Sequence, residues 1–94
     1  MSYLNGLVQN VQRMVENILA DDEEGLTLDR VEIRGTGSRM VIRVFIRRSD
    51  GVRLDDCSRV STRLSRLLDI EDLIPHRYRL EVSSPGIDKS ARTR

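Results

Sequence analysis

The chain has 94 residues, of which one third are charged, and its formal net charge is only +1. This length predicts a single domain with a modest core. The near-neutral charge excludes the class of polycations that coat nucleic acid. One Phe, two Tyr and no Trp are present, so Leu, Ile and Val are expected to build the core.

The charges are unevenly distributed along the sequence. Residues 1–29 carry one base against six acids, a net charge of −5, whereas residues 30–53 carry seven arginines against two acids, a net charge of +5. Such asymmetry is compatible with an acidic end and a basic middle that face different partners. A soluble surface on which these charges pair with one another is the alternative, and the sequence leaves both interpretations open.

The sequence predicts a cytosolic (cytoplasmic) protein without a membrane partner, because it shows no signal-peptide pattern and no apolar stretch long enough to span a bilayer. Cys57 is the only cysteine, so neither an intrachain disulfide nor a thiolate metal cluster is expected. His76 is the only histidine, and no neighbour defines a partner for acid–base catalysis. We therefore expect no metal, no cofactor and no small-molecule substrate.

Apolar residues recur at steps of three and four over residues 4–19, which predicts an amphipathic helix that ends by Gly25. The acidic run 21–24 is expected to belong to the following loop, because the helix dipole disfavours acids at the C-terminal end. Residues 26–34 favour a strand. The change of alternation within that strand predicts a bend near Asp29.

Every second residue over 40–47 is aliphatic or Met, and the other positions include two arginines, which predicts a second strand. The Gly-rich stretch 35–38 joins the two strands as a hairpin. It does not fit a phosphate-binding loop, since no Lys follows and the next element is a strand. The apolar side of this strand is expected to hold Met40, Ile42, Val44 and Ile46, and the other side Val41, Arg43, Phe45 and Arg47.

A helical step returns over residues 54–68, with Cys57 on the apolar stripe as a small buried side chain. Asp55 and Asp56 fall in the first turn, where acids interact favourably with the helix dipole. Arg53, which should cap this helix, is a poor capping residue.

Residues 78–83 alternate as a third strand, and the chain then turns. Pro85 and Gly86 suit the two central positions of a type II turn, and Ser84 is held extended by the proline that follows it. The strand should therefore run into a rigid corner. The predicted fold is an α+β, two-layer α-β-β-α-β sandwich, with two helices on one face of a three-stranded sheet.

The outer face of this sheet is the candidate binding surface. Arginines beside an exposed aromatic residue can hold a backbone phosphate and stack on a base. Glu32 and Glu81 are expected on the same face and could instead pair with these arginines across the strands. The candidate residues of this surface are Arg34, Arg39, Arg43, Phe45 and Arg47, with Arg39 in the hairpin loop.

The segment Tyr78–Asp88, YRLEVSSPGID, resembles the signature of the RimP family of bacterial ribosome maturation factors. The segment Asp50–Ser61, DGVRLDDCSRVS, and the apolar opening helix are similar to the same family, so the resemblance covers the whole chain. It implies a non-enzymatic protein that binds the small ribosomal subunit during its maturation. The implied partners are ribosomal protein twelve of the small subunit and nearby rRNA, and the implied arrangement is similar to bacterial KH domains.

The resemblance also implies a domain division and a contact site. Residues 1–88 correspond to the N-terminal α/β domain of the family, and residues 89–94 to a tail or to the start of a linker toward a C-terminal β-barrel domain absent here. Arg53 departs from the family, which usually has Thr or Ser there. The corner residues expected near the contact are Ser83, Ser84, Pro85, Gly86 and Asp88.

Two other functions remain open from the sequence. A general RNA-binding module of KH-like architecture would bind unrelated structured RNAs with comparable affinity, although the G-x-x-G loop of KH domains is absent. A small hydrolase or thiol enzyme would have to use His76 or Cys57. No set of residues in the sequence supports that last hypothesis.

Overall fold

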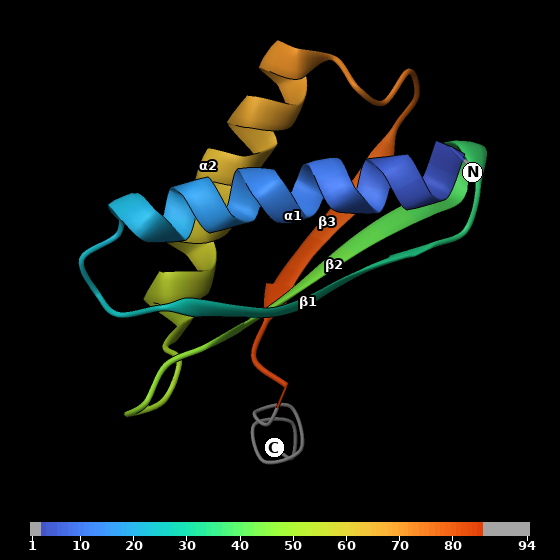
Figure 1. Ribbon diagram of the computed structural model, residues 1–94. Helices are drawn as coiled ribbons and strands as arrows, with labels where there is room; N and C mark the ends of the chain where they lie inside the picture. Colours follow the sequence, from blue (N-terminus) through green and yellow to red (C-terminus); the bar gives the residue numbers. More distant parts are fainter. Residues whose placement is uncertain (1–2, 86–94) are drawn as a thin grey trace.

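The computed structural model describes residues 3–85, and Figure 1 shows two helices packed on a small twisted sheet. The predicted α-β-β-α-β order is confirmed. The predictions for Gly86, Asp88 and residues 89–94 lie outside the described residues. The elements are α1 (Tyr3–Asp21), β1 (Thr27–Arg34), the 3₁₀ turn η1 (Gly37–Arg39), β2 (Met40–Arg47), α2 (Leu54–Glu71) and β3 (Tyr78–Ser83).

The three strands form one mixed sheet in the order β1-β2-β3. β1 and β2 are antiparallel, whereas β3 is parallel to β2 because the chain returns to the sheet through α2. The pairing register between β1 and β2 shifts between Leu28 and Arg30, which confirms the bend predicted near Asp29. Since one extra residue is absorbed there, Leu28 and Val31 both pack on the core side.

Both helices cover the same face of the sheet, and the core lies between these two layers (Figure 1). Buried residues alternate with more exposed ones along the whole central strand β2, because every second residue points into this core. Each such side chain contributes about 1.5–3 kcal/mol through its burial. The core-facing residues of β2 are Met40, Ile42, Val44 and Ile46, as predicted.

The element ends differ slightly from the sequence prediction. α1 includes Asp21, so the acidic run 21–24 begins on the last helical residue rather than in the loop. α2 continues to Glu71, and Asp72 ends it in a left-handed conformation with its N–H donating to the Leu68 carbonyl. Within residues 3–85, no helix is both long and apolar enough to cross a membrane.

Gly35 constrains the hairpin loop. Gly35 has a φ of +79°, and a Cβ atom built there would lie 2.5 Å from the backbone oxygen of Arg39. Any larger residue would therefore displace the loop that carries Arg39. This constraint fixes the connection between β1 and β2 at the end of the sheet.

Leu64 tests the packing of α2 on the sheet. Its side chain is 0% exposed, so Leu64→Ala would leave a cavity and lower the free energy of unfolding by about 2–5 kcal/mol. Leu54, on the same helix, is 86% exposed, and Leu54→Ala is the matched control with little expected effect. Urea unfolding followed by circular dichroism measures both variants. If Leu64→Ala and Leu54→Ala lowered the free energy of unfolding equally, the described packing of α2 would be contradicted.

Candidate binding surface

The outer face of the sheet is not covered by either helix, and the strand register arranges its side chains in rows (Figure 1). Residues that pair across neighbouring strands lie about 5 Å apart, so each row is a local group. From the hairpin end onward, the rows are Arg34, Val41 and Arg79; then Glu32, Arg43 and Glu81; then Arg30, Phe45 and Ser83.

Carboxylates in the middle row pair with the arginines around them. Glu32 lies 2.9 Å from Arg30 and 3.6 Å from Arg34, and Glu81 lies 3.0 Å from Arg43. The hydrogen bond from Arg30 lowers the pKa of Glu32 below its ordinary value. The cross-strand pairing that the sequence left as an alternative is therefore present for Glu81, whereas Glu32 pairs with arginines of its own strand.

A second group of ion pairs lies at the bend of β1. Asp29 accepts hydrogen bonds from Arg47 at 2.7 Å and from Arg30 at 2.6 Å, and the first of these is the main reason that its pKa is lowered. Arg79 lies 3.5 Å from Glu81 at the other edge. Among the described residues, this face thus holds five arginines and three carboxylates, and a net charge of +2 remains. Those residues are Arg30, Arg34, Arg43, Arg47, Arg79, Asp29, Glu32 and Glu81.

Phe45 lies near the middle of the face, with a cation over its ring. The Arg30 guanidinium carbon is 4.1 Å from the ring centroid, a cation–π contact. Arg30 was not selected from the sequence, although it pairs with Phe45 across the strands. The bulge at Asp29 sets this pairing, and the strand alternation alone does not reveal it. One side of the ring is consequently occupied by the chain itself.

The remaining predicted site residues lie at opposite ends of this surface. Arg39 is exposed on η1, at the hairpin end. Ser83 ends β3 beside Phe45, and Ser84 and Pro85 follow it half-buried. The described part of the corner therefore adjoins the row that contains Phe45.

A buried ion cluster at the far end of the sheet was missed in the sequence analysis. Asp56 is 2% exposed, and its carboxylate accepts hydrogen bonds from the backbone N–H of Arg53 at 2.9 Å, from Arg48 at 3.1 Å and from Arg59 at 2.9 Å. Arg59 also donates to Asp22 at 2.8 Å. The cluster connects the loop after α1, the end of β2 and the start of α2.

This cluster corrects the expectation that the start of α2 is poorly capped. The Arg53 side chain makes no capping hydrogen bond, but Asp56, three residues later, accepts one from the Arg53 backbone. This is the reciprocal half of a capping box, for which an acid at the third helical position is the sequence signal. Burial acts to raise the pKa of Asp56, but the backbone N–H, Arg59 and Arg48 outweigh it and hold that pKa below its ordinary value.

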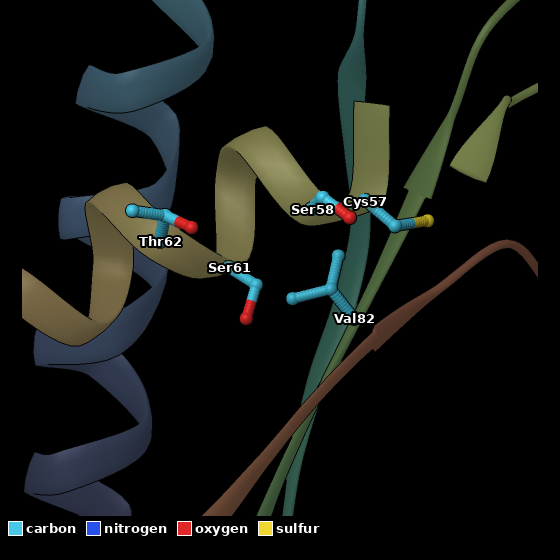
Figure 2. Close-up of a pocket in the computed structure, with 5 residues that line it drawn as sticks. All are labelled: Cys57, Ser58, Ser61, Thr62 and Val82. Carbon is cyan, nitrogen blue, oxygen red and sulfur yellow. The ribbon is translucent and has the colours of Figure 1, made fainter. Parts of the chain in front are cut away.

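An open groove of about 310 Å³ is lined by residues of α2 and β3. Figure 2 shows Cys57, Ser58, Ser61 and Thr62 on α2, with Val82 of β3 opposite them. The residues that line the groove carry hydroxyls and a thiol, but none of them carries an imidazole or carboxylate that could activate those groups as nucleophiles.

The two residues on which an enzyme would depend show no catalytic arrangement. Cys57 is half-buried at the groove rather than fully buried as predicted, and burial followed by the charge of Asp56 raises the pKa of its thiol above its ordinary value. Nδ1 of His76 lies 3.0 Å from the backbone oxygen of Arg77. Within residues 3–85, no group of three or more His, Cys, Asp and Glu side chains could hold a metal ion.

Comparison with models of protein families identifies the family of the chain. A model described as the RimP N-terminal domain matches residues 14–88, well over half of the chain. The chain belongs to the RimP family. RimP proteins are ribosome maturation factors, which places the general role of the chain in ribosome maturation with a ribosome-related partner. The match includes the two segments by which the sequence resembles RimP, Asp50–Ser61 and Tyr78–Asp88.

Asp56→Asn tests the buried cluster of this RimP domain. The variant keeps the shape of the side chain but removes the charge that Arg48 and Arg59 face, so we expect a loss of roughly 3 kcal/mol in the free energy of unfolding. Asp55→Asn, on the exposed neighbour, is the control and should lower the urea midpoint much less, since it loses only a surface ion pair and the favourable contact with the helix dipole. Equal midpoints for the two variants would contradict the account of the cluster.

The same variant gives a pH dependence with a defined sign. The pKa of Asp56 in the folded chain is below its ordinary value of 3.8, so the unfolded chain takes up this proton first as the pH falls. The stabilisation is complete above the ordinary value and is lost as the pH falls through the lowered one. The stability difference between wild type and Asp56→Asn should therefore narrow from about pH 7 to about pH 3.

Proposed function

We propose that this RimP-family chain binds the small ribosomal subunit during its maturation through the outer face of its sheet, without catalysing a reaction. Family membership supplies the ribosomal context. The choice of surface rests on the uncovered sheet face, which carries five exposed arginines and one aromatic ring but only three carboxylates.

The chemistry of this face suits a docking surface. Arginine and aromatic residues are enriched at the centres of protein interfaces, where they supply most of the binding energy. Here the ion pairs and the Arg30–Phe45 contact hold long side chains in place before binding, which reduces the entropy lost on association. The proposed contact residues are Arg34, Arg39, Arg43, Phe45 and Arg47, with Ser83, Ser84 and Pro85 adjoining them.

The proposed partners are ribosomal protein twelve of the small subunit and the rRNA beside it, and the proposed compartment is the cytoplasm, where ribosomes assemble. A surface that mixes paired charges with an excess of arginine can contact both kinds of molecule. The excess arginines favour phosphate, and the paired ones present matched donors and acceptors to a protein.

Phe45→Ala tests the docking surface. Removal of the ring would take away the aromatic contact and the surface on which the Arg30 guanidinium lies, so we expect the dissociation constant for purified small subunits to rise about tenfold. Ile70→Ala, which truncates an exposed apolar side chain on α2, is the matched control and should bind as the wild type does. Sedimentation of the chain with the subunits measures both affinities. Unchanged binding by Phe45→Ala would exclude this face as the contact.

Competition separates this function from that of a general RNA-binding module. An excess of an unrelated structured RNA should leave most of the chain on the small subunits, since the binding surface would recognise protein as well as RNA. Free small subunits serve as the reference competitor. If the unrelated RNA displaces the chain at a concentration similar to that of this competitor, the general RNA-binding function is the correct one.

A further inference from the structure

We propose that the hairpin end of the sheet binds the phosphodiester backbone of rRNA through four arginines, here called the arginine edge: Arg34, Arg39, Arg77 and Arg79. This inference rests on the proposed function and narrows it to a ligand chemistry and a place. It also adds Arg77 and Arg79, which the sequence analysis did not select.

The strand register brings these four residues to one end of the molecule. Arg34 and Arg79 both pair with Val41, from opposite sides, so their Cα atoms lie two strand spacings apart, or about 10 Å. Arg39 and Arg77 each come immediately before the first residue pair between β2 and β3. The hairpin loop and the segment leading into β3 lie at the same end in Figure 1.

The arginine edge keeps most of its positive charge available to a ligand. Within residues 3–85, neither Arg39 nor Arg77 has an ion pair or a side-chain hydrogen bond, and both are exposed. Arg34 and Arg79 reach carboxylates of the next row only at 3.6 and 3.5 Å, and their side chains are 69% and 76% exposed. Those carboxylates are held more closely by Arg30 and Arg43.

The arrangement of the helices and loops adds to this charge. The N-terminal end of α1 points to the hairpin end in Figure 1, and its first turn contains no acidic residue. The positive end of its dipole therefore lies at the same end as the arginine edge. The acidic run 21–24 lies at the opposite end of α1. A polyanion that approaches the domain would be oriented toward the arginine edge.

The composition of the arginine edge favours RNA phosphate over an acidic protein. A guanidinium presents a planar pair of donors that matches two phosphate oxygens. Two of the four lie in the Val41 row and two come just before the strands pair, so together they can follow a strand of RNA backbone. Stable protein contacts need an apolar centre. In the row that contains Arg34 and Arg79, the only apolar side chain is that of Val41, which lies between them. Phe45, the aromatic residue of the face, lies two rows away.

The test compares Arg39→Gln/Arg77→Gln with Arg53→Gln/Arg66→Gln. The control pair removes the same charge from two exposed arginines on or beside α2 that form no ion pair within residues 3–85. Binding of the whole chain is measured at several KCl concentrations, to purified small subunits and to protein-free rRNA of the small subunit. Equal urea midpoints confirm that all variants are folded.

We expect the edge variant to lose affinity for both ligands and to flatten the dependence of log affinity on log salt by about 1.5, because each lost phosphate contact removes about 0.7–0.9 from that slope. The control variant should keep the wild-type slope. A loss on subunits without a loss on rRNA would assign the arginine edge to a protein and overturn the proposal, as would an unchanged slope on both ligands.

The failure of this inference is distinguishable from failure of the proposed function. If wild type binds small subunits and the edge variant binds equally well, the proposed function stands and the arginine edge is wrong. If wild type does not bind subunits at all, the proposed function fails, and the rRNA arm alone then decides whether these arginines hold phosphate.

Discussion

The buried carboxylate of Asp56 is the interaction on which the rest of the structure depends. It binds the backbone that starts α2, the side chain of Arg48 directly after β2 and, through Arg59, the loop that follows α1. A carboxylate so deeply buried is tolerated only because three donors compensate its desolvation. With these segments joined, α1 and α2 lie on one face of the sheet, and the opposite face is left open.

Ion pairing also decides which part of that open face can attract a partner. The same kind of contact that satisfies Asp56 recurs across the sheet, where Glu32, Glu81 and Asp29 each pair with two arginines. Charged side chains that pair within the chain hold one another in place, but they attract a charged partner only weakly. The excess of arginine over carboxylate collects toward the hairpin loop. A chain with a net charge of only +1 can thereby present a basic end to RNA.

The fold could be predicted from the sequence because the spacing of apolar residues indicates which side chains are buried. The alternation of β2, the apolar steps of the helices and even the bend at Asp29 follow from which side chains enter the core. The ion cluster could not be predicted in this way, since it joins residues 34 positions apart in Asp22 and Asp56. The pairing of Arg30 with Phe45 and the placement of Arg39 and Arg77 at the same end of the sheet likewise depend on strand register, which a local pattern does not contain.

The central claim is that the open face docks on the small subunit with its hairpin end toward rRNA. Hydrogen–deuterium exchange of the whole chain, free and bound to small subunits, tests this claim most directly. The account predicts slower exchange on binding in residues 35–41 and 76–80, with no change in the acidic loop at residues 22–25. Protection confined to that acidic loop and to the start of α2 would contradict it.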